Sequence, residues 1–211
     1  MRYFLILPFI LLSACAFTDI KVNPAGTHEG LHLSGGDNRE IVLVIPFADE
    51  RKIQNRCGMK KNGYNMDTAS VSCSTPPASR LAEQVAEELK SAGFNVHTQG
   101  DAGKASGLKI QGTLLKFFVE PVIGFAMGSL ETDISIRLVA TSNNGLNAER
   151  TFFVKGTQSA MAGTESNFQS SVDDATAQIV KQMVTAIITL MNRYPELGQI
   201  SPIDLKYYAY N

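Results

Sequence analysis

Three stretches in the second half of the chain alternate between apolar and polar residues with a period of two. They cover residues 108–114, 133–139 and, more weakly, 151–157. This period places the apolar side chains of a strand on one face, which is typical of an antiparallel sheet with one buried side. The sequence Ser142-Asn143-Asn144-Gly145 predicts a hairpin turn between the last two strands. Other elements of the chain must therefore cover one face of this sheet.

Two amphipathic helices are predicted to provide this cover. The first runs from Ser79, its expected N-cap, to Gly93, which has the position of a C-terminal glycine. The second covers about 166–193 and ends before Pro195, with apolar positions that step by three and four residues. A second apolar stripe lies beside the first and consists of Val180, Val184, Ile188 and Met191. This stripe needs a partner of its own, either the other helix or another subunit.

The first half of the chain adds one clear strand. Residues 41–45 are apolar and mostly β-branched, which predicts a central strand buried on both faces. Residues 52–75 show no helical or strand period and predict a long connection. Together the elements predict an α+β fold, in which a mostly antiparallel sheet of four to five strands is covered on one face by two helices. We expect a single domain over residues 40–195.

The first fourteen residues have the order of an export signal. Arg2 precedes an apolar run at residues 3–12, and the small residues Ser13 and Ala14 stand before Cys15. A membrane span needs about twenty apolar residues, and this run has about half that number. The ending Leu-Ser-Ala-Cys resembles the lipobox of bacterial lipoproteins. This resemblance implies cleavage before Cys15, lipid on its thiol and amino group, and anchoring to a membrane.

The residues around the anchor bear on location and flexibility. Ala16 follows the cysteine, whereas an aspartate at this position usually retains such lipoproteins in the inner membrane. The resemblance therefore implies an outer-membrane protein that is lipid-anchored and faces the periplasm. Residues 15–39 are rich in glycine and asparagine and have little apolar period, so they predict a flexible tether. Residues 196–211 form a tyrosine-rich tail.

Two cysteines remain once the first carries lipid. Cys57 and Cys73 are an even pair in an oxidising compartment, which favours a disulfide across the long connection. The alternatives are a two-cysteine metal site or two free thiols. No histidine lies between the cysteines, and the three histidines of the chain are scattered. The sequence therefore favours the disulfide and predicts neither a metal nor a cofactor.

Charge and motifs point away from nucleic acid and from catalysis. The chain has 19 basic and 20 acidic residues, which gives no electrostatic footprint for nucleic acid or anionic lipid. No Gly-x-Ser-x-Gly or metal cluster is present, and the adjacent carboxylates Asp173 and Asp174 fall on a predicted helix, where neighbouring positions do not face each other. His97 stands alone at a strand end, and residues 49–51 form either a ligand-binding group after a strand or a solvated turn. We expect a protein that is not an enzyme.

Two segments are candidates for contact with a partner or membrane. Residues 120–131 lie between two strands, yet most of them are apolar where a turn should be polar. The hypothesis is an exposed apolar tip made by Val122, Ile123, Phe125 and Met127. The alternative is that these residues fold over the core. In the tail, a second docking patch is offered by Tyr207, Tyr208 and Tyr210. The alternative is again that the tail covers the domain.

The order of these elements resembles the YajG-like family of small bacterial lipoproteins. The resemblance spans residues 40–193 and is carried by Val42-Leu43-Val44-Ile45-Pro46, Asp49-Glu50-Arg51, Gly93-Phe94-Asn95-Val96 and Ile134-Ser135-Ile136-Arg137-Leu138. It implies a fold similar to the TolB amino-terminal domain and to the LpoB-type synthase activators, which bind proteins. The function expected is a non-enzymatic binding or structural module in an envelope assembly, with a protein partner or self-association. The alternative is a carrier of lipid or a small ligand.

Overall fold

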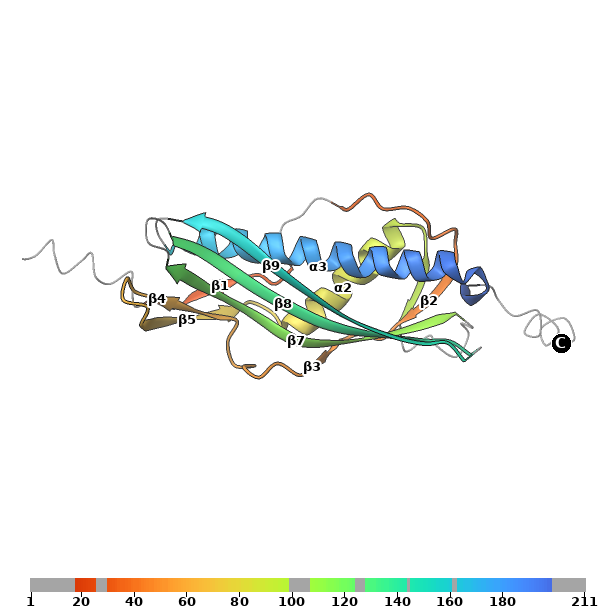
Figure 1. The fold of residues 1–211 in the computed structure, drawn as a ribbon, viewed down its shortest axis with the longest axis horizontal. Helices are drawn as coiled ribbons and strands as arrows, with labels where there is room; N and C mark the ends of the chain where they lie inside the picture. Colours follow the sequence, from red (N-terminus) through yellow and green to blue (C-terminus); the bar gives the residue numbers. More distant parts are fainter. Residues whose placement is uncertain are drawn as a thin grey trace, which may run out of the picture.

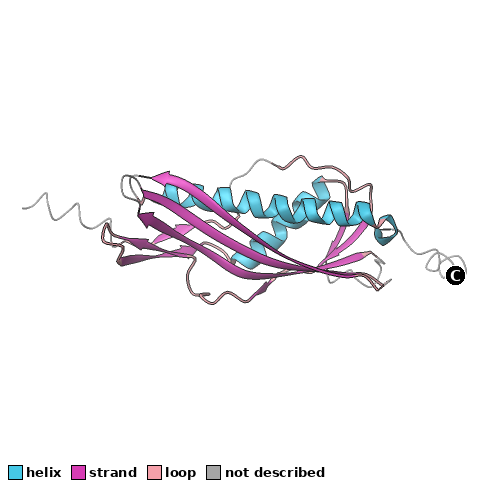
Figure 2. Ribbon diagram, viewed as in Figure 1, coloured by secondary structure: helices cyan, strands magenta, loops and turns pink. Residues whose placement is uncertain are grey.

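The described residues form a nine-stranded mixed sheet with two α-helices packed against it (Figures 1 and 2). The computed structural model describes residues 18–25, 30–98, 107–123, 128–143, 145–160 and 163–198. The expectation of a mostly antiparallel sheet of four to five strands is wrong, because the sheet is larger and several of its pairs are parallel. The two helices pack against this sheet, and their buried residues belong to one core with those of the strands.

The long strands of the second half form an antiparallel meander. β7 (Leu108–Ile123), β8 (Gly128–Thr141) and β9 (Asn147–Ala160) pair with one another in chain order. Their 16, 14 and 14 residues extend the three predicted strands to about twice the expected length. Alternate residues of β8 are buried along its whole length, as the period-two pattern predicts.

A bulge divides β7 into two parts. The register with β8 shifts between Leu114 and Lys116, and the buried side then changes from even-numbered residues to Phe117 and Val119. The alternation in the sequence is therefore lost halfway along the strand. The predicted hairpin turn before β9 is confirmed, with Gly145 at a φ of 86°.

The other edge of β7 is shared by three short strands in succession. β2 (Glu40–Leu43) pairs in parallel with the start of β7, β3 (Ala48–Asp49) follows, and β4 (Gly58–Lys61) pairs near its end at Val119. β6 (Asn95–Thr98) adds to the outer edge of β2, also in parallel. β2 is thus the predicted central strand, enclosed by β7 and β6.

The remaining strands lie in segments predicted to have none. β4 forms an antiparallel hairpin with β5 (Asp67–Cys73) inside the expected long connection. A disulfide joins Cys57 to Cys73 at the base of this hairpin, as the sequence favours. β1 (Ile20–Val22) pairs in parallel with β5, so the prediction of a flexible tether is wrong over these residues.

The two helices match their predicted positions, but the N-cap of the first helix differs from the prediction. α2 (Pro77–Ser91) begins with proline at its first turn, so Ser79 lies inside the helix and is not the N-cap. Gly93 follows the helix at a φ of 93°, as expected. α3 (Glu165–Arg193) is capped by the hydroxyl of Thr164.

α3 is buried along two stripes. The helix contacts β8 and β9 and also contacts α2, one of the two partners expected for the second stripe. Val180, Val184 and Met191 of the second stripe are fully buried. The close approach of α3 to β9 depends on Gly156, because a Cβ at that position would collide with the carbonyl oxygen of Ser171.

Candidate ligand groove

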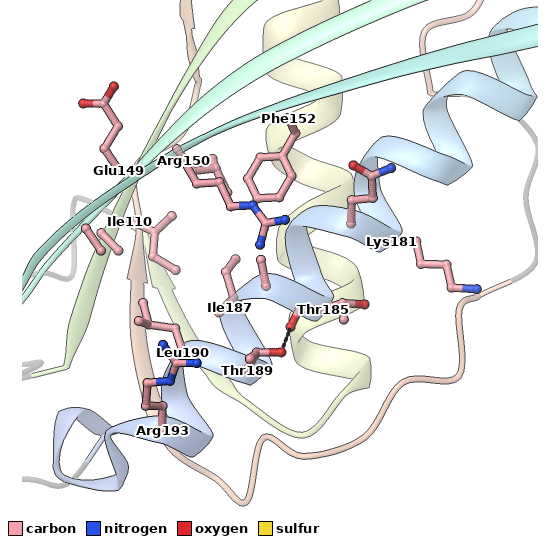
Figure 3. A pocket seen from close by; sticks show the side chains of 15 residues that line it. Ile110, Glu149, Arg150, Phe152, Lys181, Thr185, Ile187, Thr189, Leu190 and Arg193 are labelled. Atoms are coloured by element: carbon pink, nitrogen blue, oxygen red, sulfur yellow. Dashed lines mark hydrogen bonds between the residues drawn. The ribbon is translucent and has the colours of Figure 1, made fainter.

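A groove lies between the C-terminal half of α3 and the first residues of β9 (Figure 3). Its volume is about 570 Å³, within the range of small-molecule sites. The floor is formed by inward-facing apolar side chains of the meander and α3: Ile110, Leu138, Ala140, Phe152, Ile187 and Leu190. The alternation of β7, β8 and β9 therefore creates an apolar surface, which α3 leaves partly uncovered at this end.

Small side chains keep the groove open. Ala140 on β8, Ala148 on β9 and Ala186 on α3 all line it. A Leu or Phe at these positions would fill the space between helix and sheet, since protein interiors are otherwise densely packed. The groove is thus a consequence of side-chain size at three positions on three elements.

The rim of the groove is positively charged. Arg150, Lys181 and Arg193 line it, and among the described residues Glu149 is the one acidic residue in the lining. None of the three cations forms an ion pair with any residue in the described ranges. Figure 3 shows Arg150 extended across the floor toward α3, while Glu149 points away from the groove. This arrangement suits a negatively charged ligand.

Arg150 is held in place by an aromatic ring. Its guanidinium carbon lies 4.9 Å from the centroid of the Phe152 ring, a cation–π distance. The ring supports the charge over the apolar floor without neutralising it. A ligand with an apolar body and an anionic group would contact both residues at once.

The C-terminus of α3 lies near the groove, and its backbone carbonyl groups carry partial negative charge. Two arginines offset this charge. Arg39 donates to the carbonyl oxygen of Met191 at 2.6 Å and to the side-chain oxygen of Asn192 at 2.7 Å, and Arg193 stands in the last turn. The helix end therefore does not repel an anion from the groove as an uncompensated terminus would.

The charged residues noticed in the sequence have structural roles. Asp49 and Arg51 form an ion pair with each other. Burial raises the pKa of Asp49, but its hydrogen bonds to Arg51 outweigh this effect, and the net pKa lies below its ordinary value. His97 pairs with Glu40 across the β2–β6 pair and lies outside the groove. Neither group forms part of the candidate site.

Several predicted sites lie outside the described residues. They are Cys15, Phe125, Met127, Tyr207, Tyr208 and Tyr210. Ile123 ends β7, and Val122 beside it is 42 % exposed. The apolar tip at residues 122–127 and the tyrosine patch remain predictions.

The described part of the chain contains neither a cluster of metal-binding side chains nor a helix that could cross a membrane. Its His, Cys, Asp and Glu side chains form no group of three or more that could hold a metal ion. Neither α2 nor α3 is both long and apolar enough to cross a bilayer.

The sequence alone did not reveal the groove. Its lining comes from four elements that are separate in the chain, and no sequence motif marks its cations. The available signal was the coincidence of alanines on inner faces with exposed cations on the same elements. That coincidence has meaning only when the register of the strands against α3 is known.

Two solved structures share the fold of this chain. A structure of XCC0632 from Xanthomonas campestris matches with a TM-score of 0.59 at 13% identity, covering 82% of this chain and 98% of that one. A second structure, of an uncharacterized protein, has a TM-score of 0.51 at 12% identity and covers 81% and 99%. These likenesses concern the fold alone. The search of curated proteins found no match.

A weaker likeness is to lipoprotein GNA1162 from Neisseria meningitidis. It has 12% identity and a TM-score of 0.32, covers 72% of this chain and 98% of that one, and carries no argument. The sequence itself is more informative, since residues 31–186 match the model of a family described as uncharacterized lipoproteins. Because this match covers most of the chain, the protein belongs to that family, the YajG-like lipoproteins.

Proposed function

We propose that the protein is a non-enzymatic binding lipoprotein that holds an anionic amphiphile in the groove between β9 and α3. The ligand class is a single acyl chain with one anionic headgroup, such as a fatty acid or a lysophospholipid. The lipoprotein family supports anchoring in the cell envelope. The residue after Cys15 favours the outer membrane, with the domain facing the periplasm.

The observation that carries this proposal is the pairing of an apolar floor with three cations that have no ion-pair partner among the described residues. Each CH₂ group removed from water contributes about 0.8 kcal/mol, so an acyl chain on the floor supplies affinity. A carboxylate or phosphate near Arg150 supplies orientation through charge-assisted hydrogen bonds. The lining side chains are suited to binding, and this supports a carrier more directly than an enzyme.

A series of ligands with matched chain length tests the proposal. The probes are a fatty acid, the corresponding fatty alcohol and the corresponding alkyltrimethylammonium, each titrated into the purified full-length protein. We expect the acid to bind most tightly and the ammonium most weakly. Equal affinity for the three would remove the role of the cations. Absence of binding by all three would reject the amphiphile and favour a protein partner.

A further inference from the structure

The chain enters the domain close to its predicted anchor. Thr18 lies three residues after Cys15 in the sequence. An extended chain spans at most about 3.5 Å per residue, so lipid on Cys15 would hold Thr18 within about 10 Å of the membrane surface. This limit follows from covalent geometry alone.

The structure fixes Thr18 and Asp19 against the β4–β5 hairpin. The ammonium group of Lys60 donates to the carbonyl oxygen of Thr18 at 3.2 Å. The backbone N–H of Ser70 donates to the carboxylate of Asp19 at 2.7 Å. β1 runs parallel to β5, so its start lies toward the start of β5, where the β4–β5 turn is. The anchor therefore brings this particular end of the domain to the membrane.

The same end exposes apolar side chains. Tyr64 and Met66 in the β4–β5 turn are 87 % and 57 % exposed. Val122 near the end of β7 is also exposed. An ion pair links this part of β7 to the hairpin, with Nζ of Lys61 2.5 Å from Oε2 of Glu120. These three are half of the large exposed apolar residues in the described ranges. The others are dispersed over the loop after β3, the middle of β9 and the end of α3.

We infer that Tyr64, Met66 and Val122 form a membrane-facing end that rests on the lipid surface carrying the anchor. The short connection to Cys15 identifies the occupant as lipid, because the anchor itself holds Thr18 within about 10 Å of the lipid surface. Tyrosine is favoured at such an interface, where its ring meets acyl chains and its hydroxyl meets water. The inference rests on lipid at Cys15 and is independent of any ligand in the groove.

This orientation places the groove far from the membrane. α3 has 29 residues and a length of roughly 43 Å. It runs from the membrane-facing end to the groove, as Figure 1 shows from the positions of β4, β5 and the two ends of the helix. In this orientation the β4–β5 hairpin faces the bilayer, and the groove lies toward the opposite end of the domain.

Tryptophan reporters test the orientation, because the natural chain has no tryptophan. Three variants of the full-length lipidated protein carry one reporter each: Tyr64→Trp, Phe153→Trp and Tyr194→Trp. Each is placed in vesicles of phosphatidylethanolamine and phosphatidylglycerol, with and without brominated acyl chains, which quench nearby tryptophan. The residues replaced are aromatic and exposed, so the variants keep the fold.

We expect the Tyr64→Trp reporter to shift to shorter wavelength and to lose most of its emission to the brominated lipids. The Tyr194→Trp reporter at the far end and the Phe153→Trp reporter on the outer sheet face should keep theirs. Equal quenching at positions 64 and 153 would mean that the domain lies on its sheet face. Quenching confined to position 194 would mean that the opposite end of the domain faces the membrane. Either result overturns the inference, as does mass spectrometry that finds no lipid on Cys15.

Discussion

The guanidinium group of Arg51 lies side-on against the carboxylate of Asp49, with Nε 2.9 Å from Oδ1 and Nη2 2.9 Å from Oδ2. Arg51 is only 6 % exposed and also donates to the carbonyl oxygens of Gln54 and Arg56, each at 3.4 Å. Gln54 donates back to the carbonyl oxygen of Asp49 at 2.9 Å. These contacts hold the loop between β3 and β4 in place next to the Cys57–Cys73 disulfide.

The first prediction concerns this pair. Asp49→Asn should reduce the free energy of unfolding by about 1.5–3 kcal/mol at neutral pH, because it removes charge-assisted hydrogen bonds from a buried guanidinium. The pKa of Asp49 is lowered in the folded state. Its contribution is therefore complete above the ordinary value of about 3.9 and is lost as the pH falls through the lower folded-state pKa.

Denaturant unfolding at several pH values measures this difference. The gap between wild type and Asp49→Asn should be constant near neutrality and close in acid. Glu50→Gln is a suitable control, because Glu50 is exposed and pairs with Arg137 at the surface. A gap that persists unchanged in strong acid would mean that charge plays no part.

The second prediction concerns the disulfide. Replacing Cys57 and Cys73 together with serine should cost about 3 kcal/mol of stability, since the bridge closes a loop of about fifteen residues. Reduction of the wild-type protein should give a similar loss. A non-reduced digest should yield the two cysteine peptides joined, and two freely alkylated thiols would contradict the bridge.

The third prediction concerns the contact between α3 and β9. Gly156→Ala should destabilise the protein by about 1–3 kcal/mol, because its Cβ would meet backbone atoms of Ser171 and Ala175 that cannot move separately from the helix. Gly63→Ala is the matched control, since a Cβ there meets no atom within 4 Å. Thermal unfolding of the two variants measures the effect. Equal melting temperatures would show that α3 can shift without cost.

The fourth prediction concerns the groove. Arg150→Gln should weaken fatty acid binding about tenfold, the effect of losing one charge-assisted interaction, and should leave fatty alcohol binding unchanged. Arg137→Gln is the matched control, because Arg137 projects from the outer face of β8. Ala186→Phe should block both ligands by filling the groove. Acid binding that survives Arg150→Gln, Lys181→Gln and Arg193→Gln combined would refute the cationic site.

Periodicity predicted the elements that have one buried face and one solvent-exposed face over many residues. The strands around Ile134 and Phe152 and both helices are of this kind. β7 was predicted only up to Leu114, because the bulge that follows reverses the buried side. β5 was missed because its inward residues between the polar ones are only Ala69 and Val71, too few and too small to stand out.

The candidate site was less accessible to sequence reasoning. The pairing of Cys57 with Cys73 followed from counting the cysteines in the sequence, which needs no knowledge of the fold. The groove depends on how far α3 stands from β8 and β9, and no pattern within one element records this distance. The sheet was also misjudged in size and direction, because β2, β3 and β4 pair with a strand that lies much later in the chain.

The position of β7 has a consequence for the order in which the protein forms. A chain that has emerged only as far as residue 106 contains β2, β3 and β4 but lacks the strand on which all three align. In a chain exported from its amino terminus, as expected of this lipoprotein family, these three strands would arrive before the strand on which they align. Until β7 follows, the pairs of β5 with β1 and β4 and the pair of β2 with β6 can form, but they are not yet joined into one sheet. The topology of the sheet would thereby delay completion of the fold until the chain beyond residue 107 has followed.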